Sequence, residues 1–248
     1  MIINDDNKGE TKMSTKMVLF DLDGTLLPME QKVFVKTYLG MLARRLAPHG
    51  YDPEELARAI WTGTEAMVAN DGGKRNEEVF WDKFAGIFGE EARADEPLFE
   101  RFYIEEFDNV QPSCGYNPKA AEAVEQIKTM GYRVALATNP LFPSIATEKR
   151  IRWAGLTPDT FELFTSYENS RYCKPNPEYY KDVIASLGVS AEECLMVGND
   201  VGEDMIAERL GMKVFLLTDC MINKNGEDIS KYPHGSFDEL LTFVREQL

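Results

Sequence analysis

Two aspartates, Asp21 and Asp23, directly follow the short apolar run Met17–Phe20 and precede Gly24 and Thr25. The apolar run is rich in residues that favour β-structure, so it predicts a buried strand. Carboxylates two residues apart on an extended chain point to the same side of it, and a glycine allows the chain to turn at once. Because open α/β sheets bind ligands at the carboxyl ends of their strands, the sequence predicts that both acids stand at such an edge.

An aspartate followed by glycine between two apolar runs can also indicate a β-hairpin. A hairpin would need a second strand after Thr25, but the sequence has Pro28 and then a helix-like pattern. The pattern therefore favours a strand that leads into a helical region.

The stretch from residue 28 to residue 114 shows helical patterns throughout. Apolar residues such as Val33, Tyr38 and Leu42 recur at roughly helical spacing. Asp52 and Pro53 form a typical helix start, a capping side chain followed by a first-turn proline. Further helices are expected over about 77–88 and 96–107. We predict an all-helical cap subdomain over residues 28–114, inserted after the first strand.

From Pro118 onward, helical and strand patterns alternate. Strands are expected over 132–137, 161–165, 194–197 and 213–217, and helices over 120–130, 144–153, 177–187, 203–210 and 237–246. Such alternation predicts an α/β fold with a parallel sheet and right-handed crossovers. We expect residues 16–27 and 115–248 to form a Rossmann-like, three-layer core.

The overall charge limits the classes of partner. The chain carries 27 Lys and Arg against 42 Asp and Glu, a formal charge of −15. Such a surface repels nucleic acid and anionic lipid, although a few local cations still permit a small anionic substrate. No apolar run is long enough to span a membrane, and residues 1–15 are expected to be a disordered leader. The sequence does not set the oligomeric state.

The four cysteines are scattered and include no Cys-x-x-Cys pair. This spacing predicts neither a zinc site nor a disulfide framework. A reducing compartment, the cytoplasm, fits such a chain.

Three further groups of polar residues lie at expected strand ends or loops. Thr138 and Asn139 end the second core strand, Lys174 precedes a proline and a helix, and Asp200 and Asp204 follow the strand over 194–197. Each has a structural explanation: a turn, a solvated lysine, and a capping pair of Asp200 with Glu203. However, three carboxylates within five positions repel one another unless a cation is present, and Mg²⁺ prefers such oxygen ligands.

Taken in order, these four motifs resemble those of the haloacid dehalogenase superfamily, in its phosphatase branch. The resemblance covers residues 17 to about 217 and implies that Asp21 is the nucleophile and Asp23 the general acid and base. It implies a Mg²⁺ ion held by Asp21, by the backbone carbonyl of Asp23 and by Asp200. Asp204 is the other candidate for the third ligand, and otherwise would lie behind the ligands of the metal. The family more commonly has aspartate at the position of Asn199.

The resemblance further implies that Lys174, Thr138 and Asn139 contact the phosphoryl group. The expected activity is therefore magnesium-dependent hydrolysis of a small phosphorylated metabolite through an aspartyl-phosphate. A phosphosugar mutase of the same superfamily is the alternative enzyme, and a non-enzymatic binding protein on the same fold is the alternative from another class. Asp23 argues against a dehalogenase, which does not need the second acid.

The break Asp71-Gly72-Gly73-Lys74-Arg75 in the helical segment carries local positive charge. It could close over the site and select a substrate through Lys74. A solvated turn between two helices is the alternative.

Overall fold

A five-stranded parallel sheet forms the centre of the protein. The computed structural model describes residues 15–248, and its strands are β1 (Met17–Phe20), β2 (Arg133–Leu136), β3 (Cys194–Gly198), β4 (Lys213–Leu217) and β5 (His234–Gly235). Their spatial order is β2-β1-β3-β4-β5, and every neighbouring pair is parallel. The α/β fold with a parallel sheet is therefore confirmed.

Strand β1 lies between β2 and β3, and its four residues are completely buried. Phe20 pairs with Leu136 on one side and with Val197 on the other. Because parallel strands end at one edge of a sheet, this register brings the residues after β1, β2 and β3 together.

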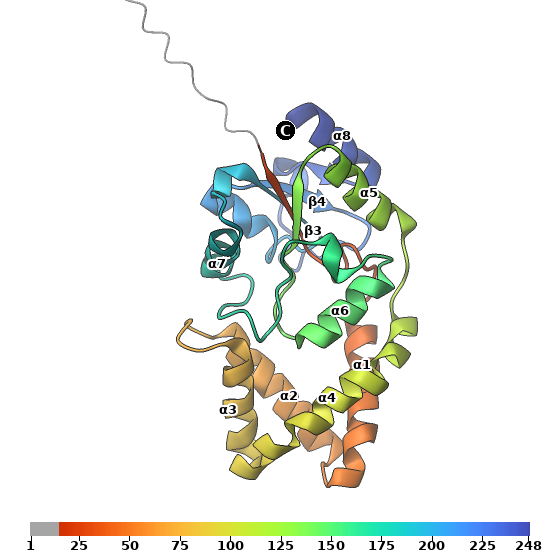
Figure 1. The fold of residues 1–248 in the computed structure, drawn as a ribbon, viewed down its shortest axis with the longest axis vertical. Coiled ribbons are helices and arrows are strands. Elements are labelled where there is room, and N and C mark those ends of the chain that lie inside the picture. Colours follow the sequence, from red (N-terminus) through yellow and green to blue (C-terminus); the bar gives the residue numbers. More distant parts are fainter. Residues whose placement is uncertain (1–14) are drawn as a thin grey trace, which may run out of the picture.

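Helices cover both faces of this sheet (Figure 1). They are α5 (Pro118–Thr129), α6 (Ser144–Trp153), α7 (Pro177–Leu187) and α8 (Phe237–Gln247). Val18 and Phe20 of β1 belong to the apolar core that includes residues of α5 and α8, whereas Met17 and Leu19 pack with residues of α7. Alternate side chains of one strand thus point into opposite layers, which is the reason that β1 is apolar throughout.

The segment between β1 and α5 is helical, as the sequence predicts. It contains α1 (Gln31–Leu46), α2 (Pro53–Val68), α3 (Asn76–Phe88) and α4 (Glu96–Glu105), which lie below the sheet in Figure 1. The chain enters and leaves this segment at one place, because Met29 bridges Cys114 and the Gly115 N–H donates to the Pro28 carbonyl at 2.7 Å. We retain residues 28–114 as the proposed cap.

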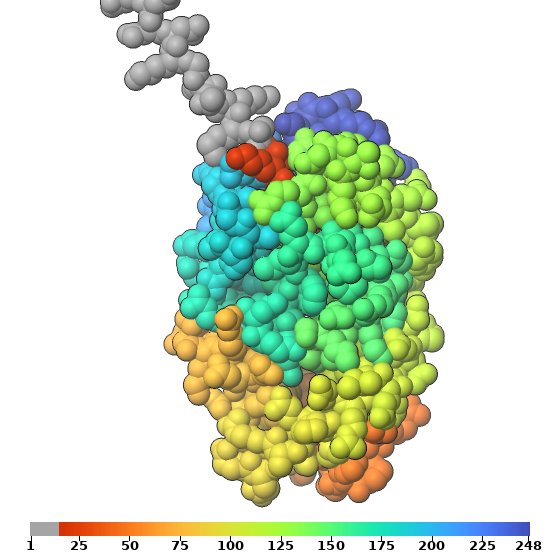
Figure 2. All heavy atoms as spheres, viewed as in Figure 1, coloured from red at the N-terminus to blue at the C-terminus, as the bar shows by residue number. Residues whose placement is uncertain are grey.

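Helix α3 begins against the core rather than in solvent. The Asn76 N–H donates to the Ser170 carbonyl at 2.9 Å, and the side chain of Asn76 is buried. Figure 2 shows the orange surface near residue 75 next to the teal surface near residue 170. The adjacent Lys74 pairs with Asp82 of α3 and does not line the pocket described below. The structure therefore gives no support to substrate selection by Lys74.

Two local predictions differ from the structure. Residues 161–165 form a single bridge, Phe164 with Leu136, at the edge of β2 and not a strand. Residues 205–210 form a 3₁₀-helix (Met205–Leu210), since the preceding turn is tied by hydrogen bonds between Asp200 and Asp204. Val33 is 44% exposed, because α1 buries the face that carries Phe34, Tyr38, Leu42 and Leu46.

The predicted leader falls almost entirely on residues 1–14, outside the described part of the chain. Within residues 15–248, no helix is long and apolar enough to cross a membrane.

Candidate active site

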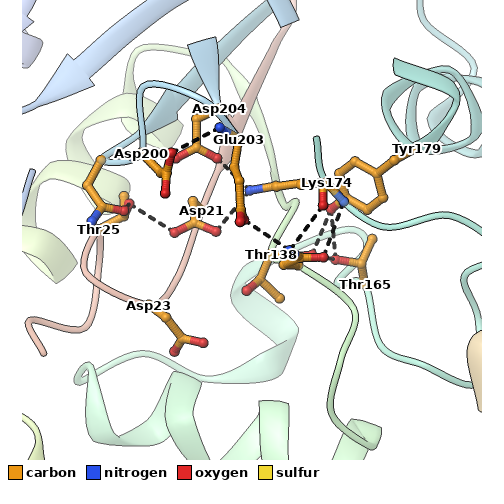
Figure 3. Close-up of polar contacts among 12 residues, drawn as sticks. Asp21, Asp23, Thr25, Thr138, Thr165, Lys174, Tyr179, Asp200, Glu203 and Asp204 are labelled. Atoms are coloured by element: carbon orange, nitrogen blue, oxygen red, sulfur yellow. Dashed lines mark hydrogen bonds and ion pairs between the residues drawn. The ribbon is translucent and has the colours of Figure 1, made fainter. Parts of the chain in front are cut away.

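Asp21 follows the last residue of β1 and is held from several sides. Its backbone N–H donates to the Val197 carbonyl at 2.9 Å, which continues the pairing of β1 with β3. Its carboxylate accepts the Thr25 hydroxyl at Oδ2 (3.1 Å) and the Lys174 ammonium at Oδ1 (2.9 Å) (Figure 3). The side chain is 10% exposed and lines the pocket, so it is fixed in position and still reachable from the pocket.

Lys174 lies between two carboxylates. Its Nζ is 2.9 Å from Asp21 Oδ1 and 2.6 Å from Asp204 Oδ1, and the residue is 1% exposed. Burial acts to lower the pKa of Lys174, but Asp204 and Asp21 outweigh burial and hold this pKa well above its ordinary value. The ammonium group is therefore charged, and it offsets part of the negative charge gathered at this edge.

Asp204 is a structural partner of Lys174 and of the loop after β3. Its second oxygen, Oδ2, accepts the Asp200 N–H at 2.9 Å. Burial raises the pKa of Asp204 to about 7, against the opposing influence of Lys174. Gly198 is required here because a Cβ at residue 198 would lie 2.1 Å from Asp204 Oδ2.

Asp200 has a freer carboxylate than Asp204. Its Oδ1 accepts the N–H groups of Gly202 (2.8 Å) and Glu203 (3.0 Å), as a helix-capping aspartate does. Its Oδ2 lies 3.9 Å from the Lys224 ammonium, and Lys224 is largely exposed. Oδ1 of Asp200 therefore has the capping role that the sequence suggested, and metal binding by Asp200 stays a prediction.

Thr138 and Asn139 follow β2 and line the same pocket. The Thr138 carbonyl accepts the hydroxyls of Thr165 (2.6 Å) and Tyr179 (2.8 Å), which fixes the backbone at this point. The Asn139 amide accepts the Lys174 N–H at 3.2 Å and donates to Glu203 at 3.0 Å. Their contact with a phosphoryl group stays a prediction, and the observed role of Asn139 is to connect two loops of the site.

Asp23 has a partner that sequence reasoning missed, Arg150 of α6. The guanidinium Nη1 donates to Asp23 Oδ2, and Arg150 is completely buried. Arg150 also donates to the Ala146 carbonyl and lies 4.4 Å over the Phe142 ring. Burial raises the pKa of Asp23 against the influence of Arg150, and the nearby Asp21 raises it further.

The other carboxylate oxygen of Asp23, Oδ1, is buried and has no hydrogen-bond partner among residues 15–248. Asp23 lines the pocket with Asp21, and Figure 3 shows its carboxylate below that of Asp21 and pointing away from it. A buried acceptor without a partner is costly unless a ligand supplies one. Asp23 Oδ1 is therefore the atom in this site that most clearly lacks its partner.

The pocket itself, about 250 Å³, lies between the carboxyl ends of the strands and the helical segment. The sheet edge contributes acids and amides, including Asp21, Asp23, Asn199 and Asp200. The opposite wall comes from α1, α2, α3 and α4 and is mainly aromatic and aliphatic. The four motifs thus meet at one place, with two walls of opposite character.

The sequence profile of the haloacid dehalogenase-like hydrolases matches residues 15–210, which is most of the chain. The chain belongs to the haloacid dehalogenase-like hydrolases. The predicted family is therefore confirmed, and the protein is an enzyme of the hydrolase class. Its four motifs meet at the sheet edge that the strand pattern predicts.

Similarity to individual members of this haloacid dehalogenase-like family is more distant. A phosphoglycolate phosphatase of Aquifex aeolicus is 25% identical over 201 residues, 81% of this chain and 84% of that protein. A glyceraldehyde 3-phosphate phosphatase of Methanocaldococcus jannaschii is 25% identical over 233 residues, 93% of this chain and 97% of that protein. The crystal structure of a phosphatase of the same family from Thermococcus onnurineus matches with a TM-score of 0.56 at 22% identity, covering 93% of this chain and 98% of that chain, which supports the fold.

Proposed function

We propose that this hydrolase is a magnesium-dependent phosphatase that cleaves a small phosphorylated metabolite through an aspartyl-phosphate on Asp21. The observation that carries the proposal is that two acids lie near one another in the site. Asp21 is a fixed carboxylate, and the neighbouring Asp23 has an oxygen, Oδ1, without a hydrogen-bond partner. The names of the relatives support the reaction class, since they are phosphatases. Small metabolites suit the pocket, and we propose neither nucleic acid nor membrane as a partner.

Asp21 is suited to attack phosphorus because β1 and its hydrogen bonds hold it still. A carboxylate oxygen forms the new O–P bond, and the bond from phosphorus to the alcohol oxygen breaks. Lys174 stays beside Asp21 throughout and balances charge on the transferred group. Water then attacks the same phosphorus, which releases phosphate and regenerates the Asp21 carboxylate.

Asp23 is suited to move the protons of both steps. The raised pKa of Asp23 favours a protonated form that can donate to the departing alcohol oxygen. After that transfer the carboxylate can accept a proton from the attacking water. Arg150 holds Oδ2, and we assign both proton transfers to the Asp23 carboxyl group.

The residues at the sheet edge fit a magnesium ion. Within residues 15–248, no three or more His, Cys, Asp or Glu side chains gather around one point, but Mg²⁺ commonly takes only one or two carboxylates, with waters and a phosphate. Asp21 and Asp200 offer such oxygens, and Asp23 would add its backbone carbonyl. Asp204 is only 1% exposed, against 7% for Asp21 and for Asp200, which favours Asp200 as the ligand. A bound Mg²⁺ would supply positive charge next to the phosphoryl oxygens.

Phosphate release from a panel of metabolite phosphates, and from nitrophenyl phosphate, tests the proposal. We expect activity that excess chelator removes and added Mg²⁺ restores, and that Asp21→Asn abolishes. Asp159→Asn, the same change at an exposed position, is the control. Undiminished turnover in excess chelator or in Asp21→Asn would refute the mechanism, and an isomeric phosphate product without phosphate release would favour the mutase.

The four cysteines are unpaired in the structure. Unpaired thiols suit a reducing compartment. We therefore propose that the enzyme acts in the cytoplasm.

A further inference from the structure

The wall of the pocket that faces the catalytic acids carries no charged side chain. Among residues 15–248, the lining residues contributed by α1 to α4 and by residues 141–167 are apolar, aromatic or neutral polar. Characteristic members are Phe34, Leu39, Trp61, Phe80, Trp81 and Phe142. The Asp and Glu residues that line the pocket all belong to the sheet edge, so this wall is the one that a leaving group would meet.

The positively charged side chains near this wall already form ion pairs with acids of the protein. Lys174 contacts Asp21 and Asp204, and Arg150 contacts Asp23. Lys149, on the same helix as Arg150, contacts Asp108 and the Ile104 carbonyl. A carboxylate on the leaving group would therefore be desolvated against this wall without a counter-ion, which is costly.

A positive charge on the leaving group would also gain little stabilisation from this wall. Aromatic faces attract cations, but the attraction is modest without a carboxylate partner. No acid lines the wall formed by the helices. The wall therefore disfavours charge of either sign.

The polar groups of this wall suit a neutral ligand. The hydroxyls of Tyr38 and Tyr103 lie 2.7 Å apart, and both residues line the pocket. Burial raises the pKa of Tyr38 to about 12 and the pKa of Tyr103 well above its ordinary value, so both hydroxyls keep their protons. One proton forms the bond between them, and the other is available to a neutral acceptor.

The volume also fits an apolar group of moderate size. A cavity of about 150 Å³ holds benzene, and this pocket has about 250 Å³. A phosphoryl group at Asp21 therefore leaves room for one ring or a branched alkyl chain.

We infer that the substrate is a phosphate monoester of an uncharged, largely apolar alcohol, with an aromatic ring or branched chain against the wall formed by α1 to α4. The inference rests on the proposed phosphatase function. It departs from phosphoglycolate, the compound in the name of one relative, because glycolate carries a carboxylate. Catalysis and selection are then separated, with the acids acting on phosphorus and the aromatic wall selecting the alcohol.

Three matched primary alcohol phosphates test this inference: 2-phenylethyl phosphate, its 4-carboxy derivative and its 4-trimethylammonio derivative. Their reacting groups are alike, so differences in kcat/KM report on the wall. We expect 2-phenylethyl phosphate to exceed each charged derivative by at least about 100-fold. Equal values, or a preference for either charged compound, would overturn the inference and leave the phosphatase function standing.

Binding of the corresponding non-hydrolysable phosphonates, measured by calorimetry, gives a second readout that does not need turnover. We expect the neutral phosphonate to bind more tightly than the carboxylated one. If no compound is hydrolysed, the phosphatase proposal fails, but the order of these dissociation constants still decides the inference. A reversed or equal order would overturn it.

A single added charge should shift the preference. Leu39 lines the pocket and is partly exposed, so Leu39→Arg can place a cation at the wall. We expect about a 10-fold gain in kcat/KM for the carboxylated phosphate relative to the neutral one. Val33→Arg adds the same charge to the exposed side of the same helix and should leave the ratio unchanged. Equal ratios in both variants would contradict the proposed role of this wall.

Discussion

Removing the buried cation Arg150 should destabilise the protein in a way that depends on pH. In Arg150→Met the Asp23 carboxylate loses its counter-ion, and breaking a buried pair from one side costs about 3–5 kcal/mol. The Asp23 side chain is 22% exposed, so we expect about 3 kcal/mol at pH 7, the lower end. The Asp23 carboxylate can avoid this cost by binding a proton. Protonation itself costs about 1.4 kcal/mol for each unit by which the pH exceeds the unfolded pKa of about 4.

The sign of the pH dependence follows from this protonation of Asp23. Without Arg150, the folded pKa of Asp23 rises further above the unfolded value, since burial and Asp21 already raise it. A raised carboxyl pKa contributes stability that is present below the unfolded pKa and is lost as the pH rises through the folded pKa. The deficit of Arg150→Met should therefore be small near pH 4 and grow toward pH 7.

Urea unfolding at pH 4.5, 6 and 7.5 measures this deficit. Arg150→Met/Asp23→Asn removes both charges and should recover most of the loss at pH 7.5, while Arg152→Met, on the exposed side of α6, should change little. A deficit of equal size at all three pH values, or additive losses in the double variant, would refute the reasoning.

Two further predictions concern single acids. Asp23→Asn should still accept the phosphoryl group from nitrophenyl phosphate, whose leaving group needs little protonation, but its second step should slow by about 10²–10⁴-fold. A burst of nitrophenolate and phosphorylated Asp21 in the mass spectrum would show this, and turnover of an alkyl phosphate at the wild-type rate would disprove it. Burial, Glu168 and Glu96 raise the pKa of Glu77 above its ordinary 4.5, so its stabilising contribution is lost as the pH rises. Glu77→Gln should therefore raise Tm more at pH 8 than at pH 4 in calorimetry, unlike the exposed control Glu65→Gln, and equal shifts at both pH values would contradict the assignment.

The position of Asp21 and Asp23 follows from local sequence alone. The spacing of Asp21 and Asp23 after an apolar run, with a glycine next, indicates a strand end, and the structure places Asp21 directly after β1. The later motifs end or follow other strands of the same sheet, and parallel strands bring such ends together. The placement of the motifs at one sheet edge therefore depends only on the hydrophobic pattern of each strand and on the order of the elements along the chain.

A helical pattern of apolar residues does not single out Arg150, because a charged residue on the buried face falls outside that pattern. The buried positions of α6 are Ala146, Thr147, Arg150, Ile151 and Trp153, so residue 150 shares a face with buried neighbours three and four positions away. That spacing was visible in the sequence. What the sequence does not reveal is the partner, because Asp23 lies 127 residues away in the chain.

The aromatic wall could not be assigned from the sequence either. Phe34, Trp61, Phe80 and Tyr103 come from four different helices. Their apolar character predicts burial in general, but the angles at which helices pack decide whether they fill a core or face a pocket. The proposed substrate selection therefore depends on tertiary packing, whereas the meeting of the four motifs depends on strand order.

The contact between Pro28 and Gly115 has a consequence for the order in which the chain folds. β1 must pair with β2, from which it is separated by the entire helical segment. The ends of that segment meet at a 2.7 Å hydrogen bond. If the helical segment folds first, the loop that must close before β1 pairs with β2 is shorter. The entropy cost of closing that loop then falls by about 1 kcal/mol. Helical contacts are local and form quickly. We therefore expect the helices that we propose to select the alcohol to assemble before the sheet that carries the proposed catalytic acids.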